Sequence, residues 1–191
     1  MNRIPFPTPE TMSPEQLVVY NKVVSGPRGK IEGPLRAALY NPELADRWQA
    51  LGAQLRYNTS LTPRLSEIAI CATGRLSQSP FEWYAHRREA EKIGLEKDIL
   101  DAILAQTQPP FKTDKEQLVY RFACELCQHR SVSDSTYAAA LAELGALTLV
   151  ELTALVGYYT MVAMTLNCHE IPLPEGIEPA FPLPQHTGAM G

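Results

Sequence analysis

The 191-residue sequence has little cysteine, no surplus of basic residues and no long continuous apolar run. Four cysteines are too few for a disulfide-dense secreted scaffold. The net charge of -4 disfavours nucleic acids and anionic lipid surfaces as partners. The longest uncharged stretch, residues 152–168, falls short of the roughly 20 apolar residues that a membrane-spanning helix needs, and is expected to form a buried helix.

The amino terminus lacks the features of a secretory signal peptide. Residues 1–7, Met-Asn-Arg-Ile-Pro-Phe-Pro, contain no continuous apolar stretch. We therefore expect a cytoplasmic protein whose cysteines are thiols in a reducing compartment. The composition, with 45% hydrophobic and 20% charged residues, is otherwise that of an ordinary globular domain.

Sixteen prolines outnumber eleven glycines, and many of these prolines stand at the two ends of the chain. Because proline has no amide donor, such segments favour extended backbone with few hydrogen bonds. We expect an N-terminal arm over residues 1–12, one domain over residues 13–171 and a proline-rich tail over residues 172–191. Residues 26–34, with three glycines and two prolines, are predicted to form a loop.

Helix-capping residues followed by proline predict where helices begin. The cap accepts hydrogen bonds from the first free amides, and proline fits the first helical position because its missing amide would have no partner there. Four such pairs are Ser13-Pro14, Asn41-Pro42, Thr62-Pro63 and Ser79-Pro80.

Other helix boundaries are indicated by caps without proline. Helices are predicted to begin at Thr113, at Ser133 and at Thr148, where Glu151 has the spacing of a capping box. Gly145 predicts a helix end. Since no alternating apolar and polar run predicts a strand, we expect an all-α fold of about eight helices.

The helix predicted from Pro63 to about Leu76 is apolar around most of its circumference. Burial of this helix would make Glu67 a lone buried carboxylate, a group suited to general acid or base work. An alternative stays open, in which Glu67 faces solvent or pairs with Arg64 one turn earlier.

His86 falls on the same apolar stripe of the next predicted helix as Trp83. A histidine in this position is more often a structural residue than a catalyst. Glu82 lies four residues before it and could orient His86 or share a metal with it. Yet Ser79 and Glu82 also have the spacing of a capping box, and no third ligand follows at helical spacing, so we expect no metal.

Three segments resemble the carboxymuconolactone decarboxylase family, whose fold is that of the alkylhydroperoxidase D (AhpD-like) proteins. They are residues 64–68 (Arg-Leu-Ser-Glu-Ile), 82–86 (Glu-Trp-Tyr-Ala-His) and 90–94. Matches at residues 33–34, 55–58, 157–159 and 166–167 extend the resemblance over about residues 15–175. The resemblance implies an AhpD-like helical bundle that assembles as a homo-oligomer, a trimer or hexamer.

In the peroxidase branch of these proteins, the resemblance implies a glutamate, a Cys-x-x-Cys pair and a histidine. Glu67 and His86 match the outer members, but Ser79 and Glu82 stand where the two cysteines would be. A serine and a carboxylate cannot cycle between thiolate, sulfenic acid and disulfide. The Cys-x-x-Cys at residues 124–127 lies inside a predicted helix and is interpreted as incidental.

The resemblance implies a cofactor-independent lyase that decarboxylates a small carboxylated lactone or a related metabolite of aromatic degradation. His86 is the expected proton donor, since its ordinary pKa lies near working pH, and Glu67 would orient its imidazole. The candidate substrate-binding residues, chosen by position, are Arg56, Tyr57, Arg64, Glu82 and Trp83. No cofactor or metal is expected.

Two other functions stay open. One is a peroxidase of the AhpD kind with a thiol outside the usual motif, for which Cys71, one turn after Glu67, is the nearest candidate. The other is a non-catalytic oligomeric binding protein that keeps Glu67 and His86 as core polar residues. Roles for Cys124, Cys127 and Cys168 are left open.

Overall fold

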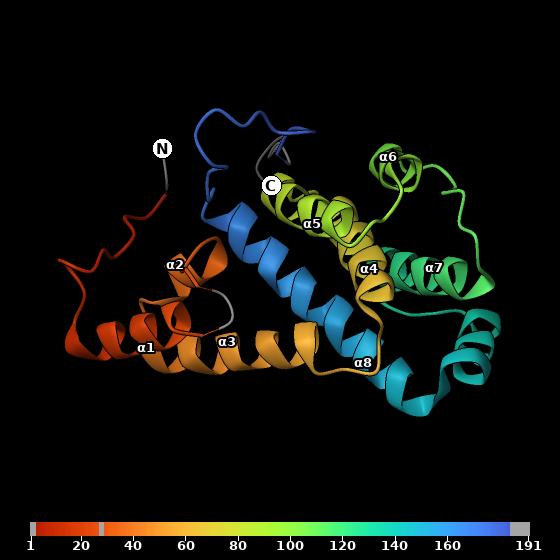
Figure 1. Ribbon diagram of the computed structural model, residues 1–191, viewed down its shortest axis with the longest axis horizontal. Helices are drawn as coiled ribbons and strands as arrows, with labels where there is room; N and C mark the ends of the chain where they lie inside the picture. Colours follow the sequence, from red (N-terminus) through yellow and green to blue (C-terminus); the bar gives the residue numbers. More distant parts are fainter. Residues whose placement is uncertain (1–2, 27–28, 184–191) are drawn as a thin grey trace, which may run out of the picture.

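The computed structural model describes residues 3–26 and 29–183. Within these ranges the chain forms helices and no strands, which confirms the predicted all-α fold of about eight helices. The helices are α1 (Pro14–Val24), α2 (Pro34–Ala38), α3 (Pro42–Tyr57), α4 (Pro63–Leu76), α5 (Pro80–Lys92), α6 (Lys97–Ala105), α7 (Asp114–His129) and α8 (Asp134–Cys168) (Figure 1).

The predicted helix starts are confirmed except that at Thr148, and most of the predicted caps form. Asn41 accepts a hydrogen bond from the Leu44 amide, and Thr62 accepts one from the Leu65 amide. Ser13 forms a full capping box with Gln16. These local hydrogen bonds explain why so many boundaries follow from the sequence.

Two predicted capping boxes are wrong. The Ser79 side chain makes no capping hydrogen bond on α5, so Glu82 does not act as the second member of a capping box. Glu151 instead accepts hydrogen bonds from the amide and hydroxyl of Ser60, and Thr148 also contacts that hydroxyl. The helix therefore continues past Thr148 without a new cap, and these side chains fix the loop before α4.

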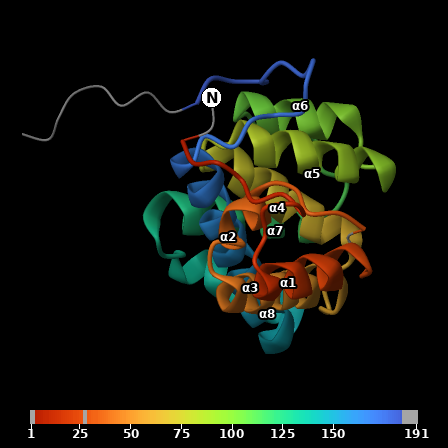
Figure 2. The same ribbon diagram turned by 90° about the vertical axis from the view of Figure 1, so that its left-hand side faces the viewer.

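The helices form two groups joined by α8. Helices α1, α2 and α3 lie at one end of the molecule and α4 to α7 at the other, with α8 running between them (Figures 1 and 2). Helix α4 packs against α5, α7 and α8, and large side chains such as Ile68, Trp83 and Phe122 are fully buried there. Burial of each such side chain contributes about 1.5–3 kcal/mol.

Helix α8 is bent at Gly145, whose φ of 77° confirms the predicted break. The part after Gly145 packs against α3, α4 and α5, as expected of a core helix. Even so, α8 is long and apolar enough to pass as a membrane span by length and composition, which the expectation from residues 152–168 did not foresee. Leu147 and Val150 leave 68% and 69% of their surface exposed.

The described parts of both termini are non-helical and lie on the helices. The Arg3 guanidinium is 2.5 Å from the Glu170 carboxylate, which ties the N-terminal segment to the end of α8. The Tyr40 hydroxyl donates to the Pro5 carbonyl at 2.7 Å. Residues 172–183 cross the ends of α5 and α8 (Figure 1). Residues 1–2 and 184–191 of the predicted arm and tail lie outside the described residues.

Candidate active site

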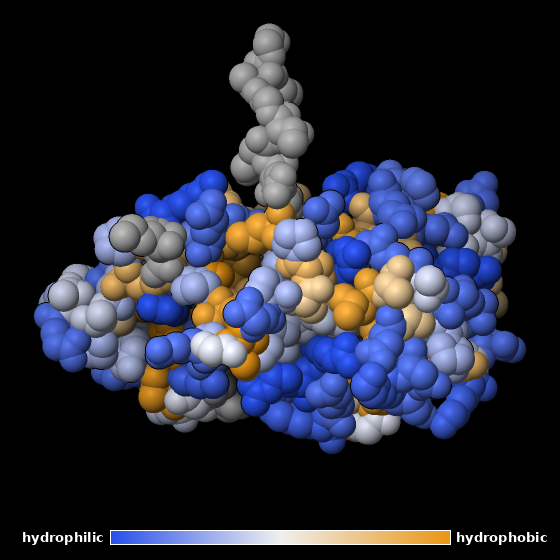
Figure 3. All heavy atoms as spheres, turned by 90° about the horizontal axis from the view of Figure 1, so that it is seen from above, coloured by the Kyte–Doolittle hydropathy of each residue, from blue (hydrophilic) through white to orange (hydrophobic). Residues whose placement is uncertain are grey.

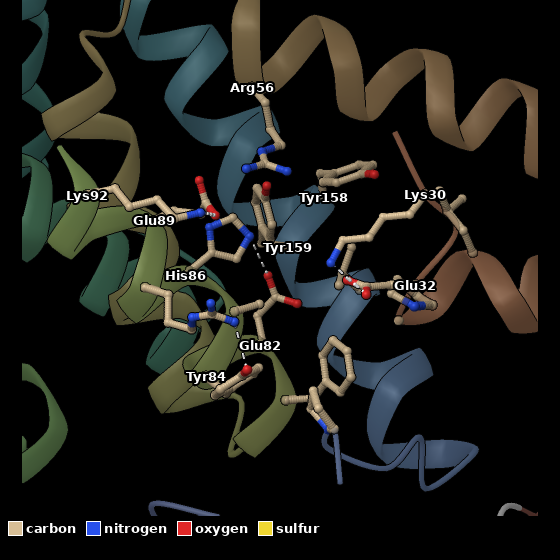
Figure 4. Close-up of a pocket in the computed structure, with 18 of the residues that line it drawn as sticks. Lys30, Glu32, Arg56, Glu82, Tyr84, His86, Glu89, Lys92, Tyr158 and Tyr159 are labelled. Carbon is tan, nitrogen blue, oxygen red and sulfur yellow. Dashed lines mark hydrogen bonds and ion pairs between the residues drawn. The ribbon is translucent and has the colours of Figure 1, made fainter. Parts of the chain in front are cut away.

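A pocket of about 450 Å³ opens between the end of α3, the exposed side of α5 and the middle of α8 (Figure 4). Four residues singled out in the sequence line it: Arg56 and Tyr57 from α3, and Glu82 and His86 from α5. The segment before α2 and one residue of the C-terminal tail close its other side.

His86 is held between two carboxylates. Its Nδ1 lies 2.8 Å from Glu67 Oε2, and its Nε2 lies 3.1 Å from Glu82 Oε1. All three side chains are buried, with 8% of Glu67, 3% of Glu82 and 6% of His86 exposed. The contact with Glu67 is a hydrogen bond, and because a carboxylate only accepts, Nδ1 carries the proton in it; the contact with Glu82 is a close charge pair.

The helices bring the three groups together in two ways. Glu82 and His86 are one turn apart on α5 and therefore meet on one face of it. Glu67 reaches His86 from α4, which packs closely on α5 at Gly74. A Cβ on residue 74 would lie only 3.1 Å from Glu82 Cγ, so glycine permits this close approach.

The electrostatic surroundings favour the charged form of His86. Burial by itself lowers the pKa of His86, but the nearby charges of Glu67 and Glu82 outweigh it. The net effect is a pKa above the ordinary value for histidine. This direction favours the imidazolium form of His86, whose Nδ1 is turned to α4 and whose Nε2 is turned to Glu82 at the pocket.

Arg56 is the cation of the pocket without a hydrogen-bonding partner among the described residues. Its guanidinium points toward Tyr159 and His86 (Figure 4) and lies 5.2 Å from the Tyr57 ring centre. Burial lowers the pKa of Arg56, but Tyr159, Tyr57 and Glu67 outweigh this effect and raise it. Arg56 thus offers a fork of N–H groups to an anion.

The other lining cations already have partners. Lys30 pairs with Glu32 at 2.6 Å, and Lys92 pairs with Glu89 at 2.7 Å. The third, Arg88, donates to the Tyr84 hydroxyl at 2.7 Å. Among these lining lysines and arginines, Arg56 is thus the one without a hydrogen-bonding partner among the described residues.

Two predicted substrate-binding residues lie elsewhere. Arg64 pairs with Glu96 and Glu116, each at 2.6 Å, and so joins α4 to α7 and to the start of α6. Trp83 is 1% exposed and packs in the core between helices. Neither lines the pocket, so both expectations are corrected, and the alternative pairing of Glu67 with Arg64 is also wrong.

The sequence reasoning missed the aromatic wall of the pocket. Tyr158 and Tyr159 of α8 line it, and the ring of Tyr159 meets the His86 ring edge to face at 4.8 Å. Phe81 and Tyr84 add two further rings. The sequence signals here were the resemblance over residues 157–159 and the uncharged stretch of residues 152–168, from which we expected only a buried helix.

The cysteines do not supply a reactive thiol to the pocket. Cys71 is fully buried, and burial raises its pKa well above the ordinary value. Burial also raises the pKa of Cys124 to about 11 and raises that of Cys127. None of these residues, nor the exposed Cys168, lines the pocket. The described residues also hold no group of three potential metal ligands.

Comparison with known proteins agrees with this architecture. Residues 42–125 match the sequence model of the carboxymuconolactone decarboxylase family. A structure described as an alkylhydroperoxidase AhpD core, an uncharacterized peroxidase-related protein from Ralstonia eutropha JMP134, has a TM-score of 0.75 at 13% identity, with 91% of this chain and 93% of that one covered. A peroxidase-related protein from Silicibacter sp. TM1040 has a TM-score of 0.75 at 10% identity, over 90% and 91% of the two chains.

A different chemistry is represented on the same fold. A variant of the debrominase Bmp8, in complex with 2,3,4-tribromopyrrole, has a TM-score of 0.72 at 12% identity and covers 89% of this chain and 91% of its own. No curated protein matches the chain significantly. At these identities the structures establish the fold alone. Residues 42–125 thus match the carboxymuconolactone decarboxylase family model by sequence, and the chain has the AhpD-like fold.

Proposed function

We propose that this pocket is the active site of a cofactor-independent lyase, which decarboxylates a small carboxylated lactone or a related metabolite of aromatic degradation. The observation that carries the proposal is His86 held between Glu67 and Glu82, beside Arg56, whose guanidinium has no hydrogen-bonding partner among the described residues. This arrangement combines a proton donor with an anion-binding group in one partly enclosed space. The family match over residues 42–125 supports the choice of reaction.

The reaction needs a proton and no electrons from outside. The bond between the carboxylate carbon and the substrate breaks, carbon dioxide leaves, and the electron pair spreads into the conjugated carbonyl. His86 then gives its Nε2 proton to the substrate carbon, and the imidazole takes a new proton from solvent. Glu82 lies 3.1 Å from Nε2 and stabilises the charged ring, while the hydrogen bond from Nδ1 to Glu67 fixes the other side of the ring.

Arg56 gives the substrate its orientation. Its two parallel N–H groups fit a carboxylate, and the absence of an ion-pair partner among the described residues leaves them available. The rings of Tyr158 and Tyr159 border the same space and suit a flat unsaturated ring. Holding the substrate against these rings places its reacting carbon near the face that His86 lines.

The test is carbon dioxide release from carboxymuconolactone and a panel of carboxylated lactones, with the purified full-length chain and no added cofactor. We expect turnover by the wild type and its loss in His86→Gln. The matched control is His129→Gln, because His129 is exposed and lies outside the pocket. Full activity of His86→Gln would refute the proton-donor role, and binding of these acids without turnover would favour the non-catalytic alternative.

We also propose that the chain associates with copies of itself through α8. Leu147, Val150, Ala154, Gly157, Met161 and Met164 are exposed and follow one another at alternating steps of three and four. This spacing forms an uncharged stripe of the kind that packs helix against helix. Sedimentation of the wild type should show an oligomer. Val150→Glu should dissociate this oligomer, whereas the control Ala50→Glu, on the exposed surface of α3, should not. A monomeric wild type would refute self-association.

A further inference from the structure

A second cavity shares the side chain of Phe81 with the pocket. It has a volume of about 360 Å³ and lies between the start of α5, the end of α8 and the C-terminal tail. Phe81 lines both cavities and is the lining residue that they share. The tail also borders both, since Pro174 lines the pocket and Leu173 lines the second cavity.

The two cavities differ sharply in chemistry. Arg56, Glu82 and His86 make the first one charged, whereas no charged residue lines the second. Asn167 is the one residue with a polar side chain that lines the second cavity, and its amide already donates to the Ser77 carbonyl at 3.0 Å. The remaining wall is apolar, and apolar surface gathers at the end of the described tail (Figure 3).

Phe81 borders both cavities and packs closely on the segment before α2. The backbone of Gly33 has a φ of 56°, and a Cβ there would lie 3.1 Å from Phe81 Cε1. Glycine therefore lets the ring lie directly against the segment before α2. The ring is only partly buried, so it can turn aside without leaving a core position.

We propose that the second cavity binds the apolar end of the ligand whose carboxylate lies at Arg56. The ligand class is an unsaturated or lactone acid with an alkyl side chain, whose chain passes Phe81 and packs against Leu166, Ile171 and the tail. The proposal rests on the proposed function only in placing the carboxylate at Arg56. Its own support is the uncharged wall directly behind the charged pocket.

Binding of straight-chain acids tests this arrangement without any turnover. Hexanoate and octanoate are titrated calorimetrically into the wild-type chain, Arg56→Gln, Leu173→Trp and Ile177→Asp. Because each buried methylene contributes about fourfold in affinity, octanoate should bind roughly 15-fold more tightly than hexanoate. Leu173→Trp should remove this ratio by filling the cavity, and Ile177→Asp should reduce it by placing a charge at the wall, while hexanoate still binds.

The control is Ile93→Trp, which adds the same bulk at an exposed position outside both cavities and should keep the ratio. Equal affinities for the two acids in the wild type would overturn the inference, as would a ratio unchanged in both tail variants. Carboxylate binding that is unaffected in Arg56→Gln would instead count against the proposed site. A missing or unaltered chain-length ratio thus counts against the second cavity, and an unaffected Arg56→Gln counts against the proposed active site.

Discussion

Glu67 Oε2 lies 2.8 Å from His86 Nδ1, although the two residues belong to different helices. This contact turns Nδ1 of the His86 ring toward α4 and leaves Nε2 on the pocket side, next to Glu82. A second-helix carboxylate thus sets both the orientation and the charge of the proposed proton donor.

The His86 pKa should respond to this contact. NMR titration of the wild type should give a pKa above the ordinary value, and Glu67→Gln should lower it because the amide carries no charge. Since the pKa is raised in the folded state, its stabilising contribution should be complete below about pH 6.5 and lost as pH rises through the folded pKa. Glu91→Gln, at an exposed site on α5, should leave the titration nearly unchanged. An unaltered pKa in Glu67→Gln would contradict this account.

Gly74→Ala should disturb the site more than the fold. The added Cβ would meet Glu82 Cγ at 3.1 Å and Glu82 Cβ at 3.3 Å, so α5 or the Glu82 side chain must shift. The better helix propensity of alanine offsets part of the cost in folding free energy, by about 1 kcal/mol. We expect a folded variant with reduced turnover and a shifted His86 titration, and wild-type behaviour in both measurements would show that the close approach is unimportant.

Arg64→Met should destabilise the fold and leave catalysis intact. It removes the partner of Glu116, which is 6% exposed, and leaves that carboxylate buried without its ion pair. Urea unfolding should show a loss of about 2 kcal/mol in the free energy of unfolding. Arg47→Met removes an exposed i, i+4 pair and should change little. Loss of turnover in a folded Arg64→Met variant would show that Arg64 has a role in the active site.

The ion pairs around Glu96 predict sensitivity to acid. Lys112 and Arg64 lower the pKa of Glu96 to about 2. A depressed pKa stabilises the folded state above the ordinary value near 4.5, and this contribution is lost as pH falls toward 2. In unfolding experiments, Glu96→Gln should therefore weaken the fold at pH 7 and converge with the wild type near pH 2. An equal difference at both values would contradict the assignment.

The thiols should react in the order of their exposure. Burial raises the pKa of Cys71, Cys124 and Cys127, which keeps these thiols protonated and slow at pH 7. Mass spectrometry after brief iodoacetamide treatment should find Cys168, the exposed one, modified first. Rapid peroxide-dependent oxidation of Cys71 would instead revive the peroxidase alternative.

The helix boundaries were predictable because their causes are local. Thr62 caps its own helix three residues away, and Gly145 breaks α8 through its own backbone conformation. The capping boxes expected at Ser79 and Thr148 do not form, and at Thr148 a tertiary contact with the Ser60 hydroxyl takes the place of the local one. A capping box is only one of the hydrogen-bond patterns that its sequence allows.

The site was only partly predictable, because long-range partners decide which side chains reach the pocket. Arg56 and Arg64 were equal candidates by position, but Glu96 and Glu116 hold Arg64 on the far side of α4. Tyr159 comes from a helix whose apolar sequence indicates only burial. Such pairings depend on packing between distant segments and have no local signature.

The most direct measurement is the reaction of carboxymuconolactone in D₂O, without added metal or cofactor, with the wild type and with His86→Gln. The account predicts that the wild type releases carbon dioxide and places one deuterium on a carbon of the conjugated system that the carboxyl group leaves. It predicts that His86→Gln does neither. Equal turnover by the two proteins, or wild-type turnover that requires an added cofactor, would contradict it.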